Sequence, residues 1–266
     1  MPELPEVETI KRSLNRNVKG KRIKRVEVFV PRLIKNPDSL RSFINSLRGR
    51  RIERVKRRGK MLILELDKGF LAIHLRIAGG LQYGKREERA RLCFLLDDGR
   101  WLNYMDARTL GEIRLVDNTE SLDFLKRLGP EPFSYSYHTW YRQLQRSRSK
   151  IKAFLLDQQK IAGLGNIYAC EALFAAKINP FRPASSLTLS ESKNLLTRIK
   201  QLLRKAIKYK GTTISDYRDA EGKKGKMQFS LKVYQRKNMP CFVCGDIIQR
   251  KIIAGRGTYF CPTCQK

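Results

Sequence analysis

Four of the six cysteines lie in two Cys-x-x-Cys pairs near the end of the sequence. Sixteen residues separate the pairs, a spacing at which two tight turns converge on one tetrahedral metal ion. Four thiolates leave no coordination position for water, so the sequence predicts one structural Zn²⁺ ion. Two disulfides or unrelated thiols are the alternative. The predicted ligands are Cys241, Cys244, Cys261 and Cys264. The other two, Cys93 and Cys170, lie in apolar runs and are expected to be core residues.

The segment between the two pairs indicates a small hairpin. Ile252–Phe260 is typical of two short strands, and we expect them to join at Gly255-Arg256-Gly257. A tip that presents Arg256 between glycines suits close approach to a phosphate. A solvated surface arginine is the alternative.

The first residues combine an unusual amine with two carboxylates. Proline at position 2 favours removal of the initiator methionine, which leaves Pro2 with a free secondary amine. An α-amino group has a pKa of about 7.7–8.0, so much of it is deprotonated near neutral pH. Its attack on an aldehydic sugar carbon gives a cationic iminium ion, which favours bond cleavage at the neighbouring carbons. Glu3 is adjacent and Glu6 lies one helical turn further on, so they can divide acid, base and positioning roles. A plain helix start, with proline and acidic residues in its first turn, is the alternative.

A basic stretch in the first half of the chain ends at a lysine in a distinctive position. Arg48–Lys60 holds eight basic residues in thirteen, and the whole chain has a formal net charge of +31. We therefore expect the stretch to follow a nucleic-acid backbone rather than to form only a solvated face. Lys60 follows Gly59 at a predicted tight turn, where its side chain can point into a cleft.

Composition narrows the classes of protein. The chain has 266 residues with 56 Lys or Arg against 25 Asp or Glu, and 41% of its residues are hydrophobic. That apolar fraction is too high for a disordered polycation, whereas the charge predicts a polyanionic partner. Nucleic acid fits better than a membrane because no long apolar run is present. The acidic start is unlike a secretory signal, so we expect a cytoplasmic protein.

The elements that must position these residues change character along the chain. A helix is expected after residue 4, then short β-rich runs separated by turns to about residue 116, which predict an antiparallel β-sandwich or barrel. Leu128–Pro132 is a predicted linker. Helices follow, the clearest of them opening with the capping box Thr188–Glu191. Gly211–Gly225 is a predicted long loop, and loops of this length are often functional.

The opening Pro2-Glu3-Leu4-Pro5-Glu6, the β-rich region with Lys60 and the four-cysteine finger together resemble the formamidopyrimidine-DNA glycosylase and endonuclease VIII family. Gly163–Tyr168 with Glu171 and Gly255–Thr258 match as well, in the expected order. The resemblance covers essentially the whole chain and is nearer to the formamidopyrimidine branch. It implies an α+β fold: a β-sandwich domain with flanking helices at 1–130, a helical domain with a helix–two-turn–helix and a lesion-capping loop at 131–232, and a zinc finger at 233–266.

The resemblance also implies roles for individual residues. Pro2 would be the Schiff-base nucleophile, Glu3 the general acid/base and Glu6 a residue that orients the site. Lys60 would contact the damaged nucleotide or its phosphate. Asn166 and Arg256 would hold DNA phosphates. The implied reaction is cleavage of the glycosylic bond followed by β- and δ-elimination.

The sequence departs from the family it resembles at positions that bear on specificity for the damaged base. Relatives fill the vacated base stack with Met, Arg and Phe, whereas the matching positions here are Ile77, Arg108 and Leu110. Ala78 stands where some relatives carry a polar residue near the damaged base. The loop Thr212–Lys226 would cap the extruded base.

Our leading hypothesis is therefore a monomeric DNA glycosylase with abasic-site lyase activity, acting in the bacterial cytosol on 8-oxoguanine and formamidopyrimidines in duplex DNA. Specificity for oxidised pyrimidines, as in endonuclease VIII, is one alternative. A noncatalytic zinc-dependent nucleic-acid binder is another, but it gives no role to the Pro-Glu start. A catalytically inactive damage sensor is disfavoured because every position that the resemblance makes catalytic is intact.

Overall fold

The computed structural model describes residues 2–266. Backbone contacts divide the chain into two compact units. The N-terminal unit comprises the residues up to Lys126 together with Ile207–Gln228, and the C-terminal unit comprises Arg127–Ala206 and Phe229–Lys266. Within residues 2–266, no helix is long and apolar enough to cross a membrane.

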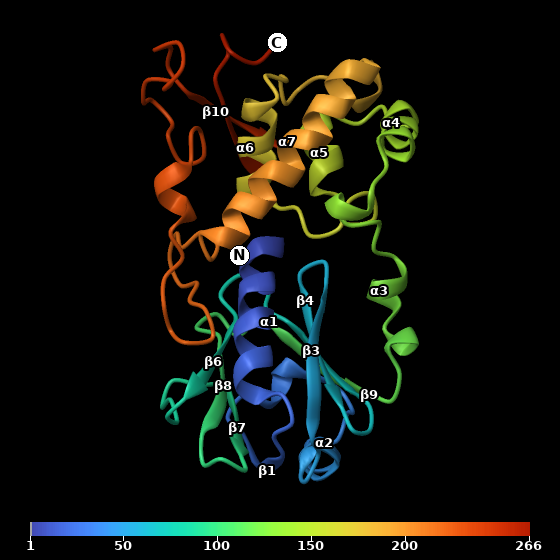
Figure 1. Ribbon diagram of the computed structural model, residues 1–266, viewed down its shortest axis with the longest axis vertical. Helices are drawn as coiled ribbons and strands as arrows, with labels where there is room; N and C mark the ends of the chain where they lie inside the picture. The colour runs from blue at the N-terminus through green and yellow to red at the C-terminus, as the bar shows by residue number, and fades with distance from the viewer. Residues whose placement is uncertain (1) are drawn as a thin grey trace. The chain divides into compact units, whose positions relative to one another are not determined.

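Two β-sheets form the N-terminal unit, which confirms the predicted α+β fold with an antiparallel β-sandwich (Figure 1). The first sheet has the order β1-β7-β8-β6, with all pairs antiparallel: β1 (Ile23–Val28), β7 (Leu92–Leu96), β8 (Trp101–Met105) and β6 (Gly80–Gly84). The second has the order β2-β9-β5-β4-β3, in which only β2 and β9 pair in parallel: β2 (Ile34–Asn36), β9 (Glu112–Val116), β5 (Phe70–His74), β4 (Met61–Leu66) and β3 (Ile52–Arg58).

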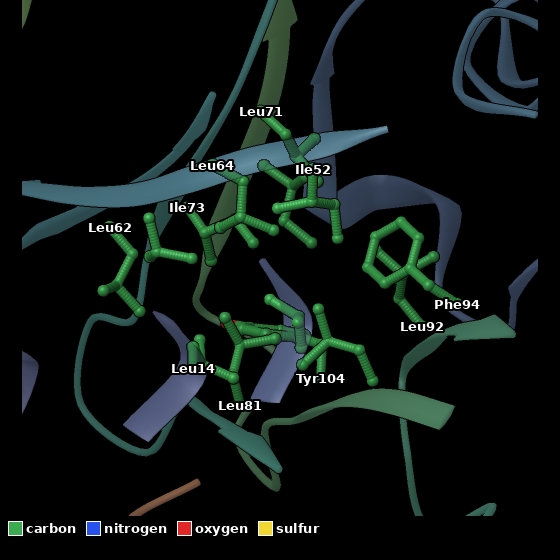
Figure 2. Close-up of a cluster of buried hydrophobic side chains, with 14 of the residues drawn as sticks. Leu14, Ile52, Leu62, Leu64, Leu71, Ile73, Leu81, Leu92, Phe94 and Tyr104 are labelled. Carbon is green, nitrogen blue, oxygen red and sulfur yellow. The ribbon is translucent and has the colours of Figure 1, made fainter. Parts of the chain in front are cut away.

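The main core of this unit is built from the apolar side chains of both sheets and of helix α1 (Leu4–Val18). Figure 2 shows Leu14 of α1 near Leu81 and Tyr104 of the first sheet, with Leu62 and Leu64 of the second sheet nearby. Alternation along a strand sends every second side chain to the same face. On β4 the opposite face is also buried, because Met61 and Ile63 pack in a smaller cluster with Leu122 and Phe124.

Two further helices complete the N-terminal unit. Helix α2 (Leu40–Leu47) begins after Ser39, whose hydroxyl accepts the N–H of Ser42, and it buries Phe43 and Leu47. Helix α3 (Asp123–Lys126) ends the first part of the unit. Residues 128–131 follow without regular secondary structure, as predicted for the linker.

The C-terminal unit is helical and ends in a hairpin. Its helices are α4 (Tyr137–Gln145), α5 (Ile151–Leu156), α6 (Asn166–Ala175) and α7 (Leu189–Lys208), of which the last two residues belong to the N-terminal unit. The capping box of α7 is confirmed: Thr188 Oγ1 accepts the N–H of Glu191 at 3.2 Å, and Glu191 Oε2 accepts the N–H of Thr188 at 2.8 Å. Strands β10 (Gln249–Ile253) and β11 (Arg256–Phe260) form the hairpin.

The basic stretch contains a strand, β3, that the sequence did not identify; on it Ile52 and Val55 are buried while most of the other side chains are at least partly exposed. Two local expectations were wrong. The apolar, β-branched run Phe70–Ile77 predicts a single strand, but β5 ends at His74, because the chain turns and the N–H of Gly79 bonds to the carbonyl of Leu75. The hairpin turns at Ala254-Gly255, so Arg256 is the first residue of β11 and pairs with Ile253.

Candidate active site and zinc centre

The carboxylate of Glu6, in the first turn of α1, accepts hydrogen bonds at the N-terminus of the helix. Pro2 is buried, and Glu3 and Glu6 are 2% and 1% exposed. Glu3 is the N-cap of α1, and Glu6 Oε2 accepts its backbone N–H at 2.8 Å. Because the first N–H groups of a helix have no partner inside the helix, this bond fixes the start of α1. The hydrogen bonds of a plain helix start are therefore present, and they fix the position of Glu3.

The second oxygen of Glu6 binds the long loop. Glu6 Oε1 accepts the N–H of Thr212 at 2.7 Å. Gly211 has a φ of +81°, and a Cβ on this residue would lie 2.8 Å from Glu6 Oε1, so glycine permits the close approach. Tyr217 donates to the carbonyl of Lys210 at 3.0 Å, and burial, with the nearby Glu6, raises the pKa of Tyr217 well above its ordinary value. Residues 211–226 contain no helix or strand, as predicted for the loop.

Lys60 lies at the turn between β3 and β4 and is 9% exposed. Gly59 has a φ of +57°, and its carbonyl accepts a hydrogen bond from Arg57 Nη1 at 2.8 Å. Arg57 Nε donates to Glu8 Oε2 at 3.0 Å, so an ion pair connects α1 to this turn. Burial raises the pKa of Glu8, but hydrogen bonds from Lys11, Arg12 and Arg57 outweigh it and hold the value at about 2.

The histidine that faces this turn is neutral. His74 pairs with Met61, the residue after Lys60, in the β4–β5 register. Burial, together with the positive charges of Arg76 and Lys60, lowers the pKa of His74 to about 4. Its Nδ1 accepts the N–H of Arg76 at 3.0 Å.

The residues expected in the base stack lie on two loops of the N-terminal unit. Ile77 and Ala78 are partly exposed in the turn after β5, whereas Arg108 and Leu110 are exposed in the loop after β8. Leu110 is 49% exposed, which is high for a leucine.

Asn166 is the first residue of α6, and its side chain is bonded at both ends within the C-terminal unit. Its Nδ2 donates to the carbonyl of Gly257 at 2.9 Å, which ties the helix start to the hairpin. Its Oδ1 accepts from Lys152 Nζ at 2.7 Å. Lys152 is 0% exposed and also lies 3.4 Å from Thr258 Oγ1. Sequence reasoning missed Lys152, although a lysine within the apolar run Ile151–Leu156 is a usable signal.

Glu171 connects α6 to the segment before the zinc finger. It is 3% exposed, and its carboxylate accepts the backbone N–H groups of Lys232, Val233 and Tyr234 at 2.8, 2.9 and 2.8 Å. Burial raises the pKa of Glu171, and the three N–H donors oppose that rise. The resemblance pointed to this residue without giving it a role.

The four predicted zinc ligands come together, with all their sulfur atoms within 4.8 Å of one another. The Sγ–Sγ distances are 3.9 Å for Cys241–Cys264 and 3.5 Å for Cys244–Cys261. Tetrahedral Zn–S bonds of about 2.3 Å require sulfur atoms about 3.8 Å apart, so the donors fit zinc. Backbone N–H groups also point at Cys241 and Cys261 Sγ, both at 3.4 Å. Arg256 is exposed on the hairpin that joins the two pairs.

Comparison with known proteins assigns the chain to a family. Three family models match it: the formamidopyrimidine-DNA glycosylase N-terminal domain at residues 1–113, the H2TH domain of the same glycosylase at 128–218, and the zinc finger found in FPG and IleRS at 240–266. Formamidopyrimidine-DNA glycosylase of Desulforamulus reducens is 44% identical over 276 residues, covering 100% of this chain and 99% of the relative. This chain belongs to the formamidopyrimidine-DNA glycosylase family. The Bacillus cereus glycosylase is 41% identical, with 100% of this chain and 99% of that protein covered.

Solved structures of formamidopyrimidine-DNA glycosylases have the same fold. The MutM (Fpg) protein of Thermus thermophilus superimposes with a TM-score of 0.89 at 39% identity, covering 99% of this chain and 98% of that one. The Lactococcus lactis Fpg (MutM) in complex with a Fapy-dG containing DNA gives a TM-score of 0.91 at 37% identity, covering 99% of this chain and 100% of that one.

Proposed function

We propose that this family member excises oxidised purines from duplex DNA and then cleaves the resulting abasic site, with the secondary amine of Pro2 as the nucleophile. The observation that carries the proposal is the burial of Pro2 beside the carboxylates of Glu3 and Glu6 at the start of α1. Glu6 is bonded both to the N–H of Glu3 and to that of Thr212, so the start of the helix is positioned before substrate arrives. Preorganisation of this kind lets a nucleophile react without rearrangement.

The reaction uses the amine as an electron sink. After removal of Met1, the Pro2 nitrogen attacks C1′ of the damaged nucleotide, the bond from C1′ to the base breaks, and the departing base takes up a proton. Glu3 protonates the ring oxygen as the sugar opens to an iminium ion. Loss of a C2′ proton then expels the 3′ phosphate, and a second elimination expels the 5′ phosphate. Two strand breaks remove the sugar and leave a one-nucleotide gap.

The remaining groups bind DNA. The net charge of +31 supplies nonspecific attraction to the backbone. Lys60 contacts the damaged nucleotide or its phosphate, and Asn166 at the start of α6 brings backbone N–H groups to a second phosphate. Arg256 reaches a third from the finger. The full-length superposition on a Lactococcus lactis Fpg bound to Fapy-dG containing DNA supports this assignment.

Ile77, Arg108 and Leu110 fill the space that the extruded base leaves, and the loop after Thr212 covers the base itself. The protein works as a cytoplasmic monomer divided into functional domains at 1–130, 131–232 and 233–266. Zinc supports the finger and takes no part in the chemistry.

Borohydride trapping tests the proposal. Reduction of the purified protein on duplex DNA that contains 8-oxoguanine or an abasic site gives a covalent adduct, which peptide mass spectrometry places on Pro2. A matched control carries one extra residue before Pro2, because the proline nitrogen is then an amide and forms no adduct. An adduct on a lysine, or no adduct with either DNA, would refute the mechanism. Faster excision of an oxidised pyrimidine than of 8-oxoguanine would refute the substrate assignment alone.

A further inference from the structure

One buried hydroxyl lies beneath both loops that carry the base-stack residues. Tyr104 is the fourth residue of β8 and is 0% exposed, with its ring in the core near Leu14 and Leu81 (Figure 2). Its hydroxyl donates to Asp106 Oδ2 at 3.2 Å, and Asp106 is itself 2% exposed. Burial and the neighbouring carboxylate raise the pKa of Tyr104, so the phenol remains a donor.

The loop Asp106–Gly111 is folded around the carboxylate of its first residue. Asp106 Oδ1 accepts the N–H of Arg108 at 3.1 Å, and Oδ2 accepts the N–H of Gly111 at 2.8 Å. Thr109 adopts a φ of +50°, and its N–H bonds to the carbonyl of Asp106. These bonds turn the backbone inward, and Arg108 and Leu110 are left exposed on the outside.

The turn Leu75–Gly79, which carries Ile77, rests on the same hydroxyl. A Cβ on Gly79 would lie 2.7 Å from the Tyr104 oxygen, and a Cβ on Gly111 would lie 1.7 Å from it. Both distances are shorter than any real carbon–oxygen contact, so each glycine backbone is pressed against Tyr104. The Tyr104 hydroxyl therefore limits how close the backbones of both loops can come to the core.

We propose that Tyr104 and Asp106 are positioning residues that hold the two loops in register, so that Ile77, Arg108 and Leu110 enter the base stack together. This inference rests on the proposed function of those three residues. A hydrogen bond from a neutral donor to a carboxylate in a buried site is strong enough to fix such a geometry. Its loss is expected to slow the step that extrudes an intact damaged base. Cleavage at an abasic site, where no base has to be extruded, is much less dependent on it.

The test uses Tyr104→Phe, which removes the hydroxyl and keeps the ring that packs the core. Single-turnover excision of 8-oxoguanine from duplex DNA is expected to fall about tenfold, corresponding to about 1.4 kcal/mol of activation free energy. Cleavage of abasic-site DNA is expected to stay close to wild type. The thermal unfolding midpoint is expected to fall by several degrees, because Asp106 loses one buried hydrogen bond, but the protein stays folded at the assay temperature. Tyr83→Phe is the matched control. Tyr83 lies on β6 of the same sheet, and its hydroxyl bonds to Lys21 and Asp98, which lie outside the two loops. This substitution leaves both rates unchanged.

A double-mutant cycle separates this inference from the proposed function. If Tyr104 acts through the loops, Tyr104→Phe causes little further loss of excision in an Arg108→Ala background. Equal losses in excision and abasic-site cleavage, additive losses in the cycle, or an unchanged excision rate would each overturn the positioning role. Failure of Arg108→Ala alone to slow excision would instead overturn the proposed function of the loop.

Discussion

Replacement of Glu171 by glutamine tests how the zinc finger is fastened to the helical unit. The carboxylate accepts three backbone N–H groups, two at Oε1 and one at Oε2. A glutamine oxygen in the place of Oε1 keeps the bonds to Val233 and Tyr234. Its NH₂ group then faces the N–H of Lys232, so one hydrogen bond is lost and two donors oppose each other. A buried hydrogen bond to a charged group contributes about 1.5–3 kcal/mol, and an unsatisfied buried donor costs a similar amount, so we expect a total loss of about 3 kcal/mol.

The positions of the two tryptophans allow this loss of unfolding free energy to be measured in the C-terminal unit. Trp140 is buried in the C-terminal unit, and Trp101 lies in the N-terminal unit. In a Trp101→Phe background, fluorescence therefore reports the C-terminal unit alone. A loss of about 3 kcal/mol corresponds to a drop of about 10 °C in the unfolding midpoint. Release of zinc to a chelator is expected to accelerate, because Val233 packs against Cys241 and Cys261 in one small cluster.

Glu191→Gln is the matched control. Glu191 is partly exposed in the capping box of α7, and its side chain pairs with Arg182. Because solvent screens this pair, the same substitution is expected to cost about 1 kcal/mol or less. If Glu171→Gln lowers the midpoint no more than Glu191→Gln, the three N–H bonds do not hold the finger and the reasoning is wrong.

Three other outcomes follow from charges and ligands described above. Chelation of zinc or Cys244→Ser is expected to abolish DNA affinity, while Trp101 fluorescence in a Trp140→Phe background still reports a folded N-terminal unit. Binding that survives metal loss would contradict the role of the finger. The unfolding free energy is expected to fall as pH drops from 6.5 toward 4, because the unfolded chain binds a proton at His74 at a higher pH than the native state does. It falls again from pH 4.5 toward 2, because Glu8 is protonated in the unfolded chain before the native state. In an acid titration of the unfolding free energy, His74→Gln should remove the first decline. DNA affinity is expected to fall about a thousandfold between about 50 and 200 mM salt; a flat salt dependence in a fluorescence anisotropy titration would show that few phosphates are contacted.

The sequence predicted the features that depend mainly on short motifs. The turn at Gly59 and the capping box at Thr188 each depend on residues a few positions apart, and the zinc ligands form two Cys-x-x-Cys pairs at a recognised spacing, so the sequence indicated all three. The strand β3 was missed because its basic residues obscure an inward pair, Ile52 and Val55, that becomes recognisable only beside β4.

Contacts between distant segments were beyond reach of the sequence. Asp106 has the appearance of an ordinary turn residue, and nothing in its surroundings indicates that its carboxylate organises the loop. Lys152 and Asn166 are fourteen positions apart, and their bond requires α5 and α6 to pack together. Glu8 and Arg57 are 49 positions apart, so their pairing depends on the register of β3 against α1. In each case the partner is chosen by tertiary packing.

The hydrogen bond between Glu6 and Thr212 joins residues that are 206 positions apart, and Ile207–Gln228 completes the N-terminal unit. During synthesis this bond cannot form until the ribosome has passed the whole helical stretch between them. At about 5–20 residues per second, that interval is roughly 10–40 s. Glu6 therefore reaches its final arrangement only after Thr212 has been made. A gene fragment that stops at Lys126 would not encode a complete unit, and a peptide covering 207–228 is the piece that it would need.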